Sequence, residues 1–223
     1  MKTFRALIFD LDGVIIDTEP KHKEAKRTAF TRYGLEVPET LYDDFRGRSD
    51  QDMAQHVVKA FGPPDLAWTE VVDLKHQIFS SLEHTIETVP GALDFIRAAR
   101  GRFEKMAVAT SATEKNQLYA FEKFGLAPFF DAVVNAKDIT HSKPNPEVFA
   151  ATVAKLGVPA EECLVIEDSR NGIVAAKGAG CSVAALTTSF TRVELLDAEA
   201  DFLVDGFAEL ADLLRLGEPP GGS

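Results

Sequence analysis

Two carboxylates stand two residues apart near the start of the chain, directly after a short apolar run. The apolar run at 6–8 is followed by Phe9 and then by Asp10 and Asp12, and Gly13 comes next. An apolar run too short for a helix and closed by Asp and Gly is typical of a buried strand that ends in a turn. Both carboxylates can then face one pocket while the glycine lets the backbone turn away. Two like charges held so close require a cation or a shared proton.

Polar residues also end two later apolar runs, and a lysine lies in a restrained loop between them. Thr110 and Ser111 close the second run, and Glu167 and Asp168 close the third. Lys143 lies in the loop 141–146, whose prolines restrict the directions in which it can point. If the strands are neighbours, hydroxyls and an amide would join the carboxylates as donors for an anionic oxygen.

Each of these groups also has a purely structural interpretation. An Asp-x-Asp-Gly sequence is common turn chemistry. The hydroxyls of Thr110 and Ser111, and later Asp168 or Ser169, can cap the helices that follow them. A single loop lysine is usually solvated. Taken one at a time, the residues leave both interpretations open.

The elements that must position these residues alternate between helix and strand after a helical first part. Predicted strands end before Asp10 and cover 106–110, 132–135, 163–166, 182–186 and 202–204. Predicted helices cover 19–33, 38–45, 50–61, 66–84, 90–101, 114–124, 146–156, 171–178 and 207–214. The fold class is therefore α/β, with a Rossmann-like, doubly wound parallel sheet wrapped by helices.

The interval from Asp10 to Thr110 is far longer than one βαβ crossover, which takes about 30 residues. No strand is predicted between residues 18 and 87. We therefore predict a helical cap at 17–87, inserted into an α/β core made of 1–16 and 88–216, with a disordered tail at 217–223. Because the insert leaves the sheet directly after the carboxylates, we expect it to act as a lid over them.

Composition excludes several classes of protein. The formal net charge of −11 over 223 residues leaves no basic surface for a nucleic-acid backbone. No apolar run reaches the ~20 residues of a membrane span, and carboxylates near the N-terminus are atypical of a signal peptide. Cys163 and Cys181 both lie beside apolar runs, which indicates buried free thiols. We therefore expect a cytoplasmic protein that binds neither nucleic acid nor membrane.

In order and spacing, the charged motifs resemble those of the haloacid dehalogenase-like hydrolase superfamily. Its four motifs are matched by Asp10-Leu11-Asp12-Gly13, Thr110, Lys143-Pro144 and Glu167-Asp168. Each motif is weak by itself, but the four together at strand ends, in this order, are highly specific. The stretches 17–22, 142–147 and 167–172 are similar to the branch that contains β-phosphoglucomutase and sugar-phosphate phosphatases. The resemblance covers nearly the whole chain and implies a small phosphorylated metabolite as substrate.

This resemblance implies catalytic roles for the motif residues. Asp10 would be the nucleophile that attacks phosphorus and forms an acyl phosphate, which water then hydrolyses. Asp12 would protonate the leaving alkoxide and next accept a proton from the attacking water. Lys143 would neutralise the phosphoryl oxygens and the nucleophile, while Thr110 and the amide of Ser111 would hold another oxygen.

The resemblance also implies Mg²⁺ as the cofactor. The ligands would be the Asp10 side chain, the Asp12 carbonyl and Asp168, with Glu167 reaching the ion directly or through water. Hard oxygen ligands suit that ion. Four carboxylates crowded around a phosphate dianion need such a compensating charge.

In the predicted cap, His22 and Lys75 fall at positions that contact substrate in the family. Alternatively, they are an exposed helical histidine and a solvated lysine. In the mutases of the branch, a Gly-x-Ser is followed by an arginine that grips the distal phosphate. Here the sequence 47–49 is followed by Asp50, which we expect to repel that phosphate. Arg46 or Arg48 could replace the missing cation.

The sequence therefore predicts a Mg²⁺-dependent phosphatase that hydrolyses a small phosphate monoester through an aspartyl-phosphate intermediate. The alternative is a hexose phosphomutase similar to β-phosphoglucomutase, which Asp50 disfavours. Asp12 argues against a dehalogenase or a phosphonate hydrolase, because those relatives lack a carboxylate at that position. The complete set of charged motif residues argues against a non-catalytic binding protein on the same fold. No motif specifies the natural substrate, or whether the chain is a monomer or a small homo-oligomer.

Overall fold

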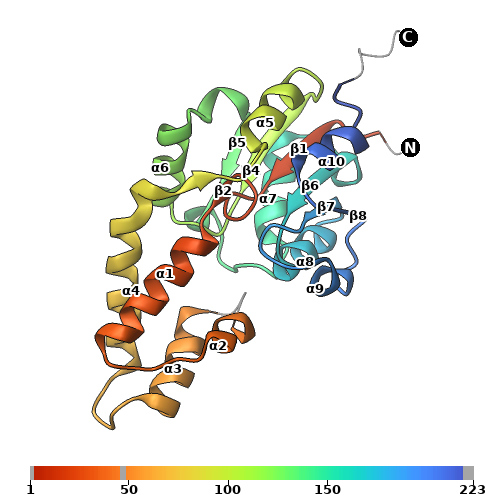
Figure 1. Cartoon of the computed structure of the whole chain (residues 1–223). Helices are drawn as coiled ribbons and strands as arrows, with labels where there is room; N and C mark the ends of the chain where they lie inside the picture. Colours follow the sequence, from red (N-terminus) through yellow and green to blue (C-terminus); the bar gives the residue numbers. More distant parts are fainter. Residues whose placement is uncertain (1–2, 46–48, 218–223) are drawn as a thin grey trace, which may run out of the picture. The chain divides into compact units, whose positions relative to one another are not determined.

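The computed structural model describes residues 3–45 and 49–217 (Figure 1). The chain divides into two units, which we call the core (residues 1–17 and 88–223) and the cap (residues 18–87). The predicted boundaries are 1–16 and 88–216 for the core and 17–87 for the cap. Of the predicted tail 217–223, only Gly217 lies within the described residues.

A six-stranded sheet lies at the centre of the core, with its paired strands parallel and in the order β5-β4-β1-β6-β7-β8 (Figure 1). Its strands are β1 (Ala6–Phe9), β4 (Lys105–Ala109), β5 (Ala132–Val134), β6 (Cys163–Glu167), β7 (Ser182–Leu186) and β8 (Phe202–Val204). The chain extends the sheet on one side of β1 and then crosses to the other side. This reversal of strand order confirms the predicted doubly wound α/β fold and marks where such sheets bind ligands.

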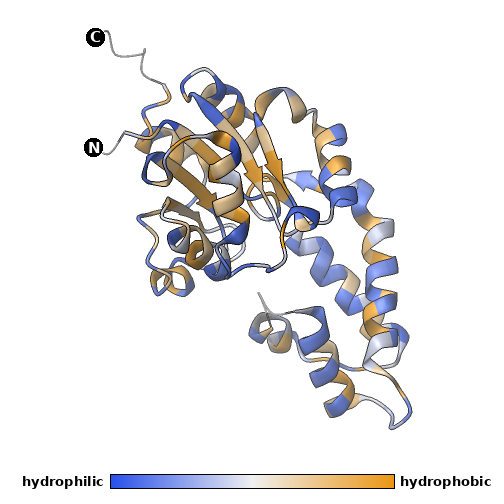
Figure 2. Cartoon of the chain, turned by 180° about the vertical axis from the view of Figure 1, so that it is seen from behind, coloured by the Kyte–Doolittle hydropathy of each residue, from blue (hydrophilic) through white to orange (hydrophobic). Residues whose placement is uncertain are grey.

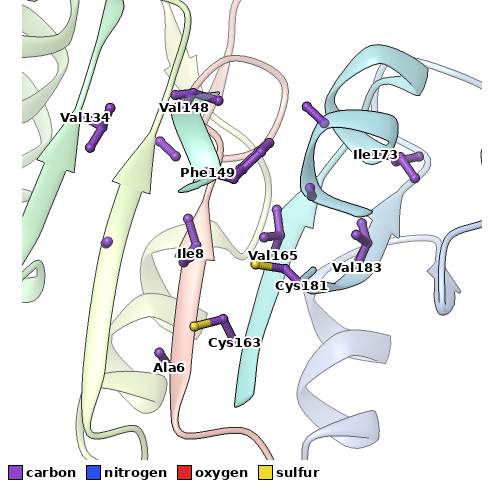
Figure 3. Close-up of a cluster of buried hydrophobic side chains, with 14 of the residues drawn as sticks. Ala6, Ile8, Val134, Val148, Phe149, Cys163, Val165, Ile173, Cys181 and Val183 are labelled. Atoms are coloured by element: carbon purple, nitrogen blue, oxygen red, sulfur yellow. The ribbon is translucent and has the colours of Figure 1, made fainter. Parts of the chain in front are cut away.

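Helices cover both faces of β1, as its uninterrupted apolar sequence requires. Ile8 packs in a buried cluster with Phe149 of α7 (Glu147–Leu156) and Ile173 of α8 (Arg170–Gly178) (Figure 3). Phe9 meets Phe95 of α5 (Ala92–Arg100) edge-on, with ring centroids 6.0 Å apart. Because successive side chains of a strand point to opposite faces, these two contacts lie on opposite sides of the sheet.

Burial in the core follows hydropathy, and the strands carry the strongest hydrophobic colouring in Figure 2. Every residue of β1, β6 and β7 is buried. Cys163 and Cys181 are buried and free, as predicted, and they belong to the cluster of Figure 3.

Some short elements of the core are not predicted by the sequence. Of the remaining core helices, α6 (Glu114–Phe124) and α10 (Phe207–Leu213) lie where the sequence predicts helices. The helix α9 (Arg192–Leu196) and the 3-10 turns at Ala127–Phe129, Ala136–Asp138 and Ala160–Glu162 were not predicted. The helix α9 is too short to display a helical period, although Thr191 and Glu194 form a capping box at its start. The strands β2 (Ile16–Asp17) and β3 (Glu87–Thr88) pair as a separate sheet, and two residues cannot display alternation.

The cap is helical, as predicted, and has an apolar cluster of its own. Its helices are α1 (Glu19–Arg32), α2 (Glu39–Asp44), α3 (Asp50–Phe61) and α4 (Trp68–Leu82), followed by a 3-10 turn at Glu83–Thr85. The helix α4 packs against both α1 and α3. Phe30, Met53, Val57 and Val71 are buried between these helices. Among the described helices, none combines the length and the apolar character that a membrane span needs.

Candidate active site

Three adjacent strands of the core deliver polar residues to the carboxyl edge of the sheet. Asp10 follows β1, and its amide donates to the Ile166 carbonyl of β6 at 3.0 Å. Thr110 follows β4, while Glu167 ends β6 and Asp168 comes next. Because β1 pairs in parallel with both β4 and β6, these ends lie side by side.

Lys143 joins the first and third of these strand ends. Its Nζ donates to Asp10 Oδ1 at 2.8 Å and to Glu167 Oε1 at 2.6 Å. The ammonium also lies 4.9 Å from the centroid of the Phe149 ring, which covers it with apolar surface. Only 9% of the Lys143 side chain is exposed, so this lysine is part of the site rather than a solvated loop residue.

Glu167 is held by the start of the following helix. Its Oε2 accepts from the Asp168 amide at 2.8 Å and from the amide and hydroxyl of Ser169, each at 2.9 Å. Ser169 in turn caps α8 by accepting from the Gly172 amide at 3.1 Å. A Cβ at Gly172 would stand 1.7 Å from Glu167 Oε1, so only glycine fits there. The carboxylate that orients Lys143 is therefore itself rigidly placed.

Burial governs the protonation of this cluster. Loss of hydration raises the pKa of Asp10 to about 7; Lys143 opposes that rise, and the charges of Glu167 and Asp12 add to it. The pKa of Asp168 also lies well above its ordinary value, first through burial and then through Glu167 and Asp10. Burial favours the neutral amine of Lys143, but its two carboxylate partners outweigh that effect and raise its pKa. Negative charge is in excess, so a further cation is favoured here.

The donor atoms of this cluster fit a hard divalent cation. Asp10, Glu167 and Asp168 are buried, and one carboxylate oxygen from each lies within 4.8 Å of the others. Both oxygens of Glu167 already accept hydrogen bonds, so Asp10 and Asp168 have the greater capacity to bind an ion. Oxygen ligands with an uncompensated negative charge suit Mg²⁺, the ion that the sequence predicts.

Gly13 lets the first loop approach Asp168 closely. Its φ is +74°, and a Cβ there would lie 1.9 Å from Asp168 Oδ2 and 2.7 Å from Ser189 Oγ. The Gly13 amide donates to the Ile16 carbonyl at 2.7 Å. The Gly13 carbonyl accepts from the Thr188 hydroxyl at 2.5 Å. Ser189 also forms a hydrogen bond with the Asp168 carboxylate.

The other predicted core residues lie at the same edge of the sheet. Thr110 is 1% exposed, and its Oγ1 accepts from the Ala112 amide at 3.0 Å, which leaves the hydroxyl proton to donate. Ser111 follows it and is exposed. Asp12 is half-buried in the loop that follows β1. Thr110, unlike Ser111, is therefore held in a fixed position by its own bonds.

The structure brings the two predicted cap residues together. Lys75 is 4% exposed, and its Nζ lies 3.0 Å from His22 Nδ1 and donates to Asp50 Oδ2 at 2.6 Å. His22 stacks on the Phe79 ring, with centroids 4.0 Å apart. Burial, and then the charge of Lys75, lowers the pKa of His22 to about 3. The imidazole is therefore neutral, and its Nδ1 accepts from Lys75. Neither residue is the solvated side chain of the alternative interpretation.

Asp50 is not the isolated charge that the sequence argument assumes. Besides Lys75, it lies 3.6 Å from Lys26 Nζ and 3.4 Å from His76 Nε2. Burial raises the pKa of Asp50, but Lys75 and Lys26 outweigh it and hold that pKa below its usual range. The expectation that Asp50 repels a phosphate is corrected accordingly, because its charge is already compensated within the cap. The other two cap predictions, Arg46 and Arg48, lie outside the described residues.

Sequence reasoning missed Thr188 and Ser189. They follow β7 in the polar stretch 187–189, at the carboxyl end of a predicted strand. That is the same signal that identifies Thr110 and Asp168. The stretch contains no charged residue, and hydroxyl groups alone did not indicate a catalytic or metal-binding role.

Comparison with known proteins finds similarity over the part of the chain that carries the core motifs. The family model described as haloacid dehalogenase-like hydrolase matches residues 7–186, a span that includes all the core motifs. The chain is 33% identical over 178 residues to a phosphorylated carbohydrates phosphatase of Thermotoga maritima, covering 78% of this chain and 81% of that protein. It is 32% identical over 181 residues to a fructose-1-phosphate phosphatase of Escherichia coli, covering 79% and 93%.

A solved structure from Thermotoga maritima, described as a candidate β-phosphoglucomutase, is also similar. The TM-score is 0.79 at 28% sequence identity, and the match covers 96% of this chain and 99% of that one. The likeness therefore extends over nearly the whole length of both chains.

Proposed function

This chain belongs to the haloacid dehalogenase-like hydrolase family, and we propose that it is a phosphatase of small phosphate monoesters, with sugar phosphates as the first candidates. Relatives at 33% and 32% identity are named as phosphatases of phosphorylated carbohydrates and of fructose 1-phosphate. The observation that carries the proposal is the contact of Lys143 with both Asp10 and Glu167. It pairs a carboxylate nucleophile with a buried cation, as transfer of a dianionic phosphoryl group requires.

In the first step, a carboxylate oxygen of Asp10 attacks phosphorus, and the bond from phosphorus to the ester oxygen breaks. The leaving alkoxide takes the proton of Asp12, so a neutral alcohol departs and an aspartyl phosphate remains. Lys143 orients Asp10 and offsets negative charge on the phosphoryl oxygens. The Thr110 hydroxyl donates to another of these oxygens.

In the second step, Asp12 takes a proton from a water molecule whose oxygen attacks phosphorus. The acyl phosphate bond breaks, inorganic phosphate leaves, and the carboxylate of Asp10 is restored. Asp12 acts first as the acid and then as the base, so each turnover returns both residues to their starting protonation states.

Mg²⁺ is the proposed cofactor. Asp10, the Asp12 carbonyl and Asp168 would hold it, with Glu167 beside them in contact directly or through water. When bound, it would supply positive charge that offsets the phosphoryl and carboxylate charges. Gly13 contributes by leaving room for the close approach of the first loop to Asp168.

Purified enzyme assayed against a panel of phosphate esters tests the proposal. We expect Mg²⁺-dependent release of inorganic phosphate from at least one sugar phosphate, loss of that activity in EDTA, and recovery with excess Mg²⁺. Full activity in metal-free buffer would contradict the metal assignment. No release from any ester, with any divalent metal, would favour a non-catalytic binding protein on this fold.

A hexose phosphomutase is the second candidate, favoured by the similarity to the candidate β-phosphoglucomutase. A mutase needs a cation for the second phosphate of its bisphosphate intermediate. Lys75 is already paired with Asp50 in the cap, so we place hydrolysis first. Following β-glucose 1-phosphate by ³¹P NMR, with and without the 1,6-bisphosphate, separates the two. Glucose 6-phosphate that accumulates faster than free phosphate would reverse this order.

A further inference from the structure

We propose that Thr188 and Ser189, in the loop after β7, are positioning residues that hold the Gly13 turn against Asp168 and so preorganise the metal-binding carboxylates. The inference deepens the proposed function and rests on it for the identity of the metal. It assigns a role to two uncharged residues that lie 20 or more positions beyond the last charged motif, Glu167-Asp168.

The first contact fixes the turn that carries the Asp pair. The Thr188 hydroxyl donates to the Gly13 carbonyl at 2.5 Å, across 175 positions of sequence. The Gly13 amide is bound to the Ile16 carbonyl at 2.7 Å, so both backbone polar groups of this glycine have partners. Gly13 directly follows Asp12, whose carbonyl is a proposed metal ligand. A hydrogen bond to the Gly13 carbonyl therefore restrains the backbone next to that ligand.

The second contact holds the carboxylate of Asp168. Ser189 forms a hydrogen bond with the carboxylate of Asp168, and a serine hydroxyl donates to such an anion. A Cβ at Gly13 would lie 1.9 Å from Asp168 Oδ2 and 2.7 Å from Ser189 Oγ. The turn, the carboxylate and the hydroxyl therefore meet at one point.

Sheet topology explains why this loop reaches both partners. The strand β7 pairs in parallel with β6, which ends just before Asp168, and β6 pairs with β1, which ends just before Asp10. The loop after β7 thus leaves the sheet at the same edge, next to the carboxylate it binds. Residues that bond to metal ligands set the orientation of those ligands, and their loss typically lowers metal affinity by about 10- to 100-fold.

The same loop offers a matched control. The Thr187 hydroxyl donates to Asp205 Oδ1 at 3.0 Å, away from the cluster. Thr187→Val removes a loop hydroxyl, as Thr188→Val does, but leaves the Gly13 and Asp168 contacts intact. A general weakening of the loop would affect both variants alike.

The test measures Mg²⁺ binding to the purified protein by isothermal titration calorimetry, independently of activity. We expect Thr188→Val and Ser189→Ala to weaken binding about 10-fold each, and Thr187→Val to leave it unchanged. Thr188→Ser, which keeps the hydroxyl, should restore the wild-type affinity. In the phosphatase assay, the Mg²⁺ concentration for half-maximal rate should rise while kcat at saturating Mg²⁺ changes little.

Wild-type Mg²⁺ affinity in folded Thr188→Val and Ser189→Ala would overturn the inference, as would an equal loss in Thr187→Val. Thermal unfolding of each variant identifies any that fail to fold. If Thr188→Val is among them, Thr188→Ser replaces it in the comparison. Wild-type Mg²⁺ affinity in Thr188→Ser then supports a role for the hydroxyl, and weakened affinity contradicts it. If wild-type protein binds Mg²⁺ and the variants bind it less, but no ester is hydrolysed, the proposed function fails while this inference stands.

Discussion

The core and the cap each contain a cluster of charged side chains, but the core cluster has an excess of negative charge, whereas the cap cluster is balanced. In the core, Lys143 pairs with Asp10 and Glu167, and the carboxylate of Asp168 lies beside theirs in the same cluster. In the cap, Asp50 is matched by Lys75 at 2.6 Å and by further basic side chains at its rim.

The pKa shifts express this difference. In the core, burial and neighbouring carboxylates raise the pKa of Asp10 to about 7 despite Lys143. In the cap, burial also acts to raise the pKa of Asp50, but Lys75 and Lys26 lower it below its ordinary value. A buried cluster with excess charge requires a partner from outside, whereas a balanced one is complete. The core cluster could therefore hold a divalent cation, as proposed above, whereas the cap cluster can maintain its geometry alone.

The largest expected effect comes from the core nucleophile. Asp10→Asn removes one charge with little change of shape, so the fold should persist while kcat falls on the order of 10⁴-fold, as for a lost covalent nucleophile. The measurement is steady-state phosphate release with the best ester of the panel. Asp94→Asn is the matched control, since the Asp94 side chain is 88% exposed on α5 and should leave kcat unchanged. Near-normal turnover in Asp10→Asn would refute the covalent mechanism.

Metal binding should stabilise the protein through the core cluster only. At a Mg²⁺ concentration of about 100 times Kd, the free energy of unfolding should rise by about 2.7 kcal/mol. Scanning calorimetry with and without Mg²⁺ measures this. Asp168→Asn should abolish the response, because it removes a proposed ligand, whereas Asp50→Asn should retain it. An equal loss in both variants would show that the two clusters are not independent.

Removing the Asp50 charge from the cap cluster should lower the stability of the protein without lowering the rate of phosphate release. Asp50→Asn leaves the Lys75 ammonium buried without its carboxylate, and Asp50 also begins α3, where a negative charge is favourable. We expect the free energy of unfolding to fall by about 1–3 kcal/mol. Urea unfolding followed by fluorescence of Trp68, the single tryptophan, reports on the cap.

Two further variants sharpen that result. Asp73→Asn changes an exposed residue of α4 and should have no effect. Combined with Lys75→Met, Asp50→Asn should cost less than the two single changes added together, because the double variant leaves no unpaired charge. Strict additivity would mean that the ion pair contributes nothing.

The smallest expected effect is an opposite response to pH in the two clusters. The pKa of His22 is about 3 in the folded cap, below its ordinary value, so the unfolded chain takes up a proton first as the pH falls. The cap should therefore lose stability on the order of 1 kcal/mol between pH 7 and about pH 5. His22→Gln should remove that loss, and His84→Gln, an exposed cap residue, should not.

In the metal-free core the sign is reversed. Asp10 has a folded pKa of about 7, above its unfolded value, so the folded state keeps a proton that the unfolded chain releases between about pH 4 and pH 7. This residue therefore adds stability as the pH falls through that window. Calorimetry of EDTA-treated wild type and Asp10→Asn measures it, and an identical pH dependence in the two proteins would contradict the raised pKa.

The sequence by itself determined the fold class and the edge of the sheet that carries the core motifs. Apolar runs of strand length ending in Asp10, Thr110 and Glu167 are local signals, and each strand lies within one residue of its predicted bounds. The sequence left open whether these strands are neighbours. The structure places β1 between β4 and β6, and the carboxyl ends of such neighbouring parallel strands adjoin.

Only the tertiary structure decided which side chains pair within each cluster. Thr188 reaches Gly13 across 175 positions, and Lys75 reaches Asp50 across 25. Nothing in the local pattern of either residue marks its partner, and Asp50 was therefore expected to act as a free charge. Burial and pairing arise when separate elements pack, and they decide whether a carboxylate repels an anion, binds a cation or neutralises a lysine.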